Sequence, residues 1–405
     1  MLDDFGQRIR DIILSEMDLS RELSDEEICD LIGSVVSREA RDRPMTIKDR
    51  AELERTIFNS LRKLDVLQEL VDDRDVTEIM VNGPNDIFYE KAGRIQRFKG
   101  HFSSEEKLED VIQQIVGRHN RVVNQASPIV DTRLSDGSRV NIVLNPISIG
   151  GSAVSIRKFP EHPMSMERLV EIEALSPDVA RLLQILTQAK YNIFISGGTG
   201  SGKTTFLNAL SQYIPDDERI ITIEDSAELQ LLGAKNIVRL ETRNANTDGV
   251  TPITIRDLIR TALRMRPDRI IVGECRGAEA LDMLQAMNTG HDGSLSTGHA
   301  NSPQDIISRI ETMVLQGQDF PLNAIRQQIA SGIDIIVQLG RLRDKSRRVL
   351  EVSEVDGFMD GEIVLHTLYR FEETAVLDSG RIQGFLKKAG TLCHTDKLMA
   401  AGLSV

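Results

Sequence analysis

The spacing of hydrophobic and polar residues changes along the chain, and each spacing predicts a different kind of structure. Over residues 1–72, apolar residues recur every three or four positions among charged ones, beginning with Ile9, Ile12 and Ile13. This spacing is typical of amphipathic helices. Ser24 and Glu27 have the spacing of a capping box ahead of the second of these helices. We therefore predict an N-terminal bundle of charged helices.

Residues 73–158 alternate between apolar and polar positions, which is the period of half-buried strands. Val76–Val81 is the first such segment, and Asn82–Asn85 turns the chain back. A helix is expected after Ser103, and a second hairpin turns at Asp136–Gly137. Strands and a helix of these lengths predict a small α+β domain.

A linker is expected over residues 159–168, because its two prolines, Pro160 and Pro163, disfavour both a helix interior and an inner strand. From 169 to 375, short apolar segments alternate with helical ones, which predicts an α/β fold with a parallel sheet and crossover helices. Residues 376–405 are expected to form a C-terminal tail. The strands are expected at Ile193–Ile195, Ile220–Ile223 and Ile270–Val272.

Composition excludes several classes of protein. The chain has 405 residues, enough for two or three domains, and its hydrophobic and charged fractions are those of a globular protein. The longest charge-free stretch, Val140–Ile156, contains Asn, Ser, Pro and a Gly pair and cannot span a bilayer. The start of the chain does not resemble a signal peptide. Cys29, Cys275 and Cys393 lie far apart, which fits a reducing compartment and provides no zinc cluster. We expect a soluble, cytoplasmic, multidomain protein.

The net charge is unevenly distributed. The chain carries 62 acidic and 49 basic residues, a formal charge of −13, and residues 1–75 alone hold 20 acidic and 12 basic ones. The acidity therefore belongs mainly to the predicted helical bundle. This bundle is either a docking element for a basic partner surface or a solvated face with no partner.

A phosphate-binding loop is the strongest chemical signal. Residues 197–204 match G-x-x-x-x-G-K-[ST], with an apolar strand before them and an amphipathic helix after them. Backbone amides of such a loop converge on the phosphates at a helix N-terminus. Lys203 is expected to reach the β- and γ-phosphate oxygens, and Thr204 to place its hydroxyl on Mg²⁺. The residues predicted to bind ATP are Gly197, Gly198, Thr199, Gly200, Ser201, Gly202, Lys203, Thr204 and Thr205.

Acidic residues follow two of the predicted strands. Glu274 ends one strand, with Gly273 at the position where the usual motif has Asp, and Glu224 and Asp225 end another, with Glu228 beyond them. The carboxyl ends of parallel strands share one edge, so both groups are expected to face the phosphate loop. We assign Glu224 to polarising the attacking water and Glu274 to Mg²⁺ through its water shell. Position in the sequence leaves an exchange of these two roles open.

Two of the seven histidines, His291 and His299, lie close together among small and polar residues. A zinc pair is disfavoured because no Cys is near and the spacing of acids fits no common zinc motif. An imidazole near the γ-phosphate could sense hydrolysis or stabilise charge. We expect His299 to be this sensor, with His291 as a second candidate.

These residues together resemble the ATPases of type II and type IV secretion and of type IV pilus systems. Gly197–Thr204 looks like the Walker A motif of this family, and Arg219–Asp225 looks like its Asp box. Leu263–Glu279 is similar to its Walker B motif, and Ser294–Ser302 is similar to its His box. The segments Val76–Pro84 and Arg133–Asn141 are most similar to the tight-adherence (Tad, CpaF-like) pilus branch. The resemblance runs from about residue 60 to 370, and the four-cysteine zinc element of the type II branch is missing.

The resemblance implies a hexameric Mg²⁺-dependent ATPase with a RecA-like domain, preceded by a small PAS-like α+β domain that closes over ATP. It implies an inner-membrane platform protein as partner, and hence peripheral membrane association at the cytoplasmic face. Arginines of the α+β domain contact phosphates in this family. Arg133 and Arg139 match those positions and Arg157 is a weaker match, while Arg264 and Arg276 of the Walker B segment are further candidates.

The hairpin at Asp136–Gly137 constrains the two arginines that match best. A two-residue turn pairs Arg139 with Leu134 and sends Arg133 and Arg139 to opposite faces of the sheet. A three-residue loop, Asp136–Ser138, places both on one face. If both arginines touch ATP, the loop must have the second form.

Other functions remain open from the sequence. A RecA-like nucleic-acid translocase requires a basic channel, and arginines do cluster from Arg256 to Arg269. They flank the catalytic strand, so we expect no nucleic-acid partner. A protein that binds but does not hydrolyse the nucleotide is disfavoured by the two carboxylate sites. Within the family, pilus assembly, pilus retraction and substrate export by a type IV secretion system remain alternatives.

Overall fold

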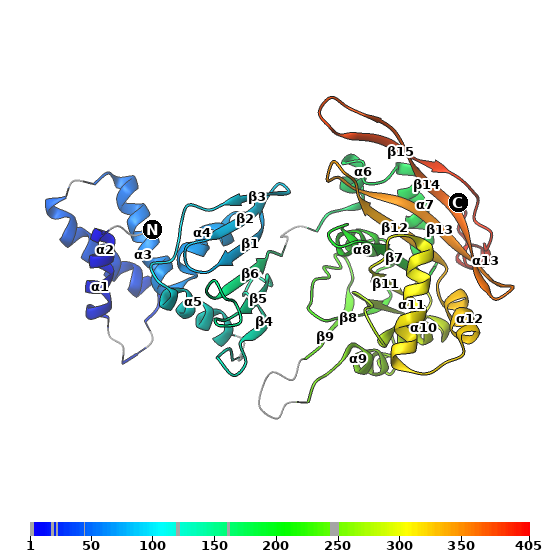
Figure 1. The fold of residues 1–405 in the computed structure, drawn as a ribbon, viewed down its shortest axis with the longest axis horizontal. Helices are drawn as coiled ribbons and strands as arrows, with labels where there is room; N and C mark the ends of the chain where they lie inside the picture. Colours follow the sequence, from blue (N-terminus) through cyan, green and yellow to red (C-terminus); the bar gives the residue numbers. More distant parts are fainter. Residues whose placement is uncertain are drawn as a thin grey trace. The chain divides into compact units, whose positions relative to one another are not determined.

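The computed structural model describes residues 4–17, 20–21, 23–43, 45–118, 122–159, 163–243 and 251–405. These residues form two compact units, one within 4–159 and the other within 163–405 (Figure 1). Residues 160–162 of the predicted linker lie outside the described residues. Its last residues begin helix α6, Met166–Glu171.

The first unit starts with the predicted helical bundle. Ser24 accepts the amide of Glu27 at 3.2 Å and Glu27 accepts the amide of Ser24 at 2.8 Å, which confirms the capping box. The apolar faces of three helices meet in a small core that includes Ile9, Ile32 and Ile57. The elements are α1 (Asp4–Glu16), α2 (Asp25–Glu39), the 3₁₀ turn Ala40–Asp42, α3 (Ile47–Arg62), the 3₁₀ turn Asp65–Leu67 and α4 (Gln68–Asp72).

The rest of the first unit is a six-stranded antiparallel sheet in the order β3-β2-β1-β6-β5-β4. Alternate side chains of the strands pack with one face of helix α5, as their period of two requires. The elements are β1 (Val76–Asn82), β2 (Ile87–Lys91), β3 (Arg94–Arg97), α5 (Glu105–Gly117), β4 (Ile129–Arg133), β5 (Arg139–Val143) and β6 (Ala153–Arg157).

The hairpin between β4 and β5 differs from both predicted forms. Arg133 lies directly opposite Arg139, and the amide of Leu134 donates to the carbonyl of Ser138 at 2.8 Å. The connection is a three-residue loop, Ser135–Gly137, one residue earlier than expected. The two-residue turn is therefore wrong. The two arginines lie on one face of the sheet, as the three-residue form required.

The second unit is a nine-stranded sheet in the order β15-β14-β13-β12-β7-β11-β10-β8-β9, parallel from β12 to β9 and antiparallel from β12 to β15. This confirms the α/β fold with a parallel sheet. Its strands are β7 (Ile193–Gly197), β8 (Arg219–Glu224), β9 (Asn236–Glu241), β10 (Arg269–Val272), β11 (Leu295–Gly298), β12 (Ile335–Arg341), β13 (Arg347–Met359), β14 (Glu362–Val376) and β15 (Ile382–Lys388).

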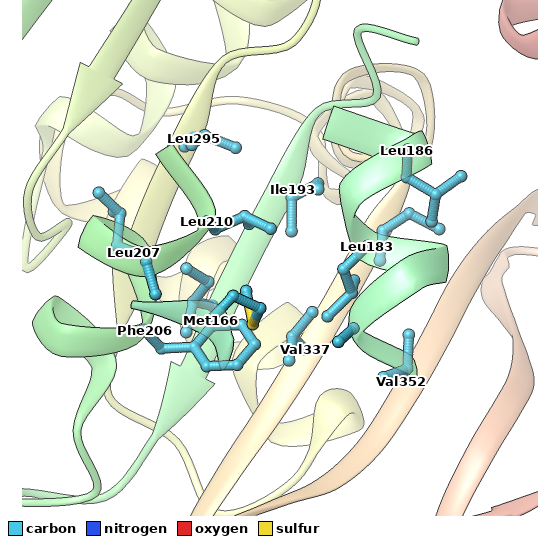
Figure 2. Close-up of a cluster of buried hydrophobic side chains, with 14 of the residues drawn as sticks. Met166, Leu183, Leu186, Ile193, Phe206, Leu207, Leu210, Leu295, Val337 and Val352 are labelled. Carbon is cyan, nitrogen blue, oxygen red and sulfur yellow. The ribbon is translucent and has the colours of Figure 1, made fainter. Parts of the chain in front are cut away.

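Helices cover both faces of this sheet. On one face, Leu183 of α7 and Leu207 of α8 pack with Ile193 of β7 (Figure 2). On the other, residues of α9 to α12 form a second apolar cluster with β8 and β10. The helices are α6, α7 (Pro177–Gln188), α8 (Lys203–Ser211), α9 (Ile255–Ala262), α10 (Glu279–Asn288), α11 (Pro303–Gly317) and α12 (Leu322–Gly332).

The residues after 375 are part of the second unit. Strand β15 pairs with β14, and a short helix α13 (Asp396–Ala401) follows. The buried carboxylate of Glu354 accepts the amides of Cys393 at 2.7 Å and His394 at 2.8 Å. The carboxylate of Glu354 on β13 thus holds the C-terminal segment to the sheet. Among the described helices, none has the length and apolar character needed to cross a bilayer.

Candidate active site

The phosphate loop lies between β7 and α8, as the sequence predicts. Gly200 (φ 71°) and Gly202 (φ 94°) adopt left-handed conformations that suit glycine. Gly197 has no room for a side chain, because a Cβ there would lie 2.6 Å from Ser201 Oγ and 2.7 Å from the carbonyl oxygen of Leu339. Lys203 Nζ donates to the carbonyls of Gly197 at 3.1 Å and Gly198 at 3.2 Å. The lysine therefore curls back over the loop at the start of α8.

This loop has polar groups suited to a phosphate ligand. Thr204 and Thr205 lie in the first turn of α8, where the backbone amides and the helix dipole favour an anion. The hydroxyls of Ser196 and Ser201 are buried, and neither has a hydrogen-bond partner among the described residues. A buried hydroxyl without a partner carries a desolvation cost that a ligand oxygen would relieve. The loop therefore fits the phosphates of a nucleotide.

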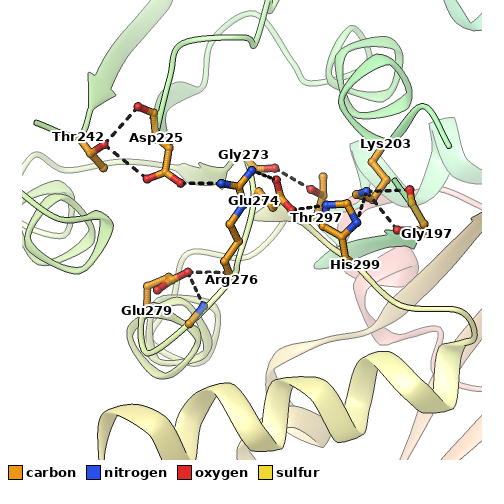
Figure 3. A network of polar contacts seen from close by, with 12 residues as sticks. Gly197, Lys203, Asp225, Thr242, Gly273, Glu274, Arg276, Glu279, Thr297 and His299 are labelled. Atoms are coloured by element: carbon orange, nitrogen blue, oxygen red, sulfur yellow. Dashed lines mark hydrogen bonds and ion pairs between the residues drawn. The ribbon is translucent and has the colours of Figure 1, made fainter. Parts of the chain in front are cut away.

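A chain of polar contacts leads from the lysine to the end of β10 (Figure 3). Lys203 Nζ lies 3.3 Å from Nδ1 of His299, and Nε2 of His299 lies 2.7 Å from Oε1 of Glu274. Because an ammonium group only donates, Nδ1 must accept and the ring proton must be on Nε2, the ring nitrogen nearer the carboxylate. Burial and the positive charge of Lys203 lower the pKa of His299, which favours this neutral form.

Arg276 extends the contacts to the neighbouring strand. Its guanidinium lies 2.6 Å from Glu274 Oε2 and 3.4 Å from Asp225 Oδ2, so it joins the ends of β10 and β8 (Figure 3). Burial raises the pKa of Glu274, but the hydrogen bond and charge of Arg276, with the charge of Lys203, lower it overall. Glu274 is therefore an ionised carboxylate among cations.

Glu224 has a different environment from Glu274. Only 5% of it is exposed, and its carboxylate accepts the backbone amides of Glu228 at 2.8 Å and Leu229 at 3.0 Å. Burial raises its pKa to about 7, although the two amide hydrogen bonds act in the opposite direction. Glu228 contributes its backbone to this arrangement. The two strand-end acids predicted for the site thus differ in the direction of their pKa shifts and in their partners.

Mg²⁺ would find suitable donors here. The hydroxyl of Thr204 and the carboxylates of Glu224 and Glu274 are the hard oxygen groups that Mg²⁺ prefers. No cluster of three or more His, Cys, Asp or Glu side chains in the described part of the chain could hold a metal by itself. In phosphoryl-transfer sites Mg²⁺ commonly binds through the nucleotide and water.

Two predicted candidates lie away from the phosphate loop. His291 precedes β11, at the strand end opposite His299, and its Nδ1 lies 3.2 Å from the carbonyl of Ala286. Arg264 precedes β10 and so also lies at the amino edge of the parallel sheet. Within the same arginine cluster, the structure pairs Arg256 and Arg260 with Asp282, at 2.7 and 3.0 Å.

The arginines predicted to contact phosphates belong to the first unit. Arg133 pairs with Arg139 across β4 and β5, and Arg139 pairs with Arg157 across β5 and β6. The Nε of Arg157 lies 3.9 Å from Glu78 on β1. Three arginines therefore form one row across neighbouring strands. Their contact with a nucleotide stays a prediction.

Sequence reasoning missed two residues at the loop. Arg347, the first residue of β13, donates from Nε to the carbonyl of Gly200 at 2.8 Å. Gln338 of β12 donates to the carbonyl of Ala300, next to His299, at 3.2 Å. Both are brought here because β12 pairs with the phosphate-loop strand β7. Arg347 belongs to the basic run 341–348, and no motif marks either residue.

Comparisons with known proteins agree with this arrangement. The family described as "Type II/IV secretion system protein" matches residues 60–383. The conjugal transfer protein TrbB of Rhizobium radiobacter is 31% identical over 81% of this chain and 98% of its own length. The type IV secretion system protein PtlH of Bordetella pertussis is 33% identical over 73% of this chain and 94% of its own length.

A solved structure shows the same fold. The pilus retraction motor PilT, determined with bound ADP, covers 82% of this chain and 84% of its own, with 21% identity and a TM-score of 0.52. The fold of the second unit is the RecA-like P-loop fold of these secretion ATPases. The phosphate loop, the two strand-end acids and the His299 segment therefore lie in a family match that covers most of the chain. This chain belongs to the type II/IV secretion system ATPase family.

Proposed function

We propose that this protein hydrolyses ATP to drive the assembly of a pilus through a membrane platform. The observation that carries the proposal is the chain of contacts from Lys203 through His299 and Glu274 to Arg276 and Asp225. It joins the phosphate-binding lysine to the strand-end acids within one site. Such a chain can report whether a phosphate is present at one end to the groups at the other.

The phosphate loop binds and orients the triphosphate. Backbone amides and the hydroxyl of Ser201 are available to phosphate oxygens, and Lys203 exchanges its carbonyl and imidazole contacts for the β- and γ-phosphates. The hydroxyl of Thr204, and Glu274 through water, would hold Mg²⁺. The ion supplies positive charge against the charge that develops on the phosphates.

The two glutamates and His299 act beside the transferred phosphate. We assign Glu224 to polarising the attacking water, since a carboxylate with a pKa near 7 is well suited to take up a proton near neutral pH. Glu274 then acts through the water shell of the metal. His299 senses the γ-phosphate, because a phosphate that draws Lys203 away changes the contacts on both ring nitrogens.

The working assembly is proposed to be a homohexamer. The row Arg133, Arg139 and Arg157 lies on one unit, and arginines that complete a phosphate site stabilise the charge of the transition state. The relatives support a role in a secretion or pilus machine, since they are named for conjugal transfer and type IV secretion. We propose a position at the cytoplasmic face of the inner membrane, reached through the platform protein.

The Tad, CpaF-like branch is the form of machine that the N-terminal segments favour, and assembly is its expected direction. Substrate export by a type IV secretion system is a second candidate, favoured by the PtlH match over most of both chains. A nucleic-acid translocase has less support, because Arg256 and Arg260 are paired with Asp282 inside the unit.

The test measures phosphate release against oligomer size for the wild-type chain and for Lys203→Ala. Hydrolysis that requires Mg²⁺, belongs to the hexamer and rises with the platform protein is the expected result. Activity in a monomer, or activity stimulated by DNA with a steep salt dependence, would contradict the proposal. Phosphate release equal in wild type and Lys203→Ala would show a contaminating enzyme.

A further inference from the structure

The glycine that stands in place of the usual aspartate of this strand end lies against Glu224. A Cβ on Gly273 would lie 2.8 Å from Cγ, 3.3 Å from Oε2 and 3.5 Å from Cδ of Glu224. The side chain from β8 therefore fills the space that any side chain at 273 would need. The two strands β8 and β10 are paired neighbours, so this contact lies within one sheet edge.

Neither partner of this contact is free to move away. The amide of Gly273 donates to the carbonyl of Ile223 at 2.9 Å, and the hydroxyl of Thr297 donates to the carbonyl of Gly273 at 2.8 Å. On the other side, the amides of Glu228 and Leu229 hold the carboxylate of Glu224. A side chain at 273 would have to break one of these sets of hydrogen bonds.

The backbone of Gly273 does not itself require glycine. Its φ lies outside the left-handed region, unlike that of Gly200 or Gly202 in the phosphate loop. An alanine at 273 would therefore meet no conformational strain. The obstacle to a side chain at this position is the carboxyl group of Glu224.

We propose that Gly273 is a positioning residue for Glu224: by carrying no side chain, it lets the β8 carboxylate lie against the end of β10. This inference rests on the proposed function, in which Glu224 polarises the attacking water. A methyl group at 273 would push the carboxylate out of its amide hydrogen bonds. Misplacing a reacting group by about 1 Å can cost on the order of 10²-fold in rate.

The first measurement compares the wild-type chain with Gly273→Ala in steady-state hydrolysis and in the binding of a fluorescent ATP analogue. We expect kcat to fall at least about 10-fold, while the dissociation constant of the analogue changes less than about twofold. Loss of both in equal proportion would indicate general disruption of the site and overturn the positioning role. Gly33→Ala is the matched control, because a Cβ there meets nothing within 4 Å.

The decisive measurement is a double-mutant cycle of Gly273→Ala and Glu224→Ala. Glu224→Ala removes Cγ, Cδ and Oε2, the three atoms that a methyl group at 273 would meet. It lowers kcat by itself, but adding Gly273→Ala to it is expected to change the residual kcat less than about twofold. If Gly273→Ala costs the same factor in the wild-type and Glu224→Ala backgrounds, Glu224 is not the obstacle and the proposal fails.

The same cycle is followed in unfolding temperature, which needs no activity. Gly273→Ala is expected to lower that temperature by several degrees in the wild-type background and to have little effect in the Glu224→Ala background. Equal losses in both backgrounds would overturn the proposal. If the wild-type chain does not hydrolyse ATP, the proposed function fails, and this thermal cycle still decides whether Gly273 positions Glu224. If Gly273→Ala does not fold, recovery of folding in Gly273→Ala/Glu224→Ala supports the proposal, and failure of both overturns it.

Discussion

The two edges of the parallel sheet carry polar side chains in very different arrangements. At the carboxyl edge, Lys203, His299 and Glu274 contact one another in a partly open chain, and the hydroxyls of Ser196 and Ser201 have no partner within the described residues. At the amino edge of the same strands, polar groups are joined into closed networks. The comparison suggests that one edge is left for a ligand while the other holds the strands together.

The amino edge shows how completely buried polar groups can be paired. Arg269 is fully buried, bonds Glu218 through two nitrogens, and donates to the carbonyls of Thr187 at 2.8 Å and Gly293 at 3.2 Å. Asn192, just before β7, bonds Ser294 and Gly332 with its side chain. These contacts link the starts of β7, β10 and β11. The strand ends that carry the site are therefore anchored from the opposite side.

The largest effect is expected from a substitution that disrupts the polar contacts of the carboxyl edge alone. Lys203→Ala removes the charge that we propose contacts the phosphates and should lower kcat by more than about 10³-fold. The unfolding temperature should change little, because the contacts of Lys203 with the carbonyls of Gly197 and Gly198 and with His299 lie within the phosphate site. Phosphate release and a thermal melt on the same sample check both parts. A large loss of stability would show that this edge is structural as well.

The second largest effect is expected from a substitution that disrupts the buried polar network of the amino edge. Arg269→Met leaves Glu218 buried without its main partner and is expected to cost about 3–4 kcal/mol of stability. Lys190, 3.6 Å from Glu218, compensates only in part. Denaturant unfolding gives the free energy, and kcat measured well below the melting point should stay within about threefold.

The double variant Arg269→Met/Glu218→Gln sharpens this prediction. Removing both charges avoids the unpaired buried carboxylate, so it should cost less than Arg269→Met alone. A double variant that is less stable than the single one would mean that Glu218 has another essential partner. A loss of kcat at full folding would show that the amino edge also shapes the site.

The difference between the two edges also explains what the sequence could predict. The phosphate loop, Glu224 and Glu274 each depend on a short stretch of chain that ends a strand, so local patterns identify them. Arg347 reaches Gly200 across 147 positions of sequence, through the pairing of β12 with β7. No local pattern contains that information.

Pairing between strands also decides where other residues named from the sequence lie. His291 and His299 lie eight positions apart in sequence but at opposite ends of β11, because a four-residue strand separates them. The loop between β4 and β5 is shifted by one residue from the expected form, since cross-strand pairing decides its register. The contact between Gly273 and Glu224 needs two strands side by side. In the sequence, the only sign of this contact is a glycine at a position where an acid is usual.

A smaller effect is expected on the pH dependence of the unfolding free energy, which tests the charge state of Glu224 at the carboxyl edge. The pKa of Glu224 is about 7 in the folded protein, above its ordinary value of 4.5. A carboxyl with a raised pKa favours the folded state while protonated, so its contribution is full below pH 4.5 and is lost as the pH rises through 7. Glu224→Gln keeps the group neutral and should be more stable than wild type at pH 8, by roughly 1–3 kcal/mol.

Unfolding free energies measured at pH 5 and pH 8 check this prediction. The difference between Glu224→Gln and wild type should grow with pH. Asp378→Asn, at an exposed carboxyl, is measured beside it as the control. A pH-independent difference would mean that Glu224 is ionised throughout the range. Glu224→Gln should also bind ATP while losing hydrolysis, if Glu224 polarises water.

The smallest effect concerns the link between the C-terminal helix and the amino edge. Lys397 Nζ lies 2.8 Å from Asp292, before β11, and 2.7 Å from Asp334, before β12. Burial raises the pKa of Asp334, and the charge and hydrogen bond of Lys397 oppose that shift. Lys397→Met should therefore cost about 1 kcal/mol, because Asp334 keeps the amide of Asn192 and can take up a proton. Asp334→Asn/Lys397→Met should recover part of that loss, as measured by urea unfolding. If Lys397→Met instead lowers kcat with stability unchanged, the amino edge affects catalysis at the site. The assignment of stability to the amino edge and of ligand binding to the carboxyl edge would then be wrong.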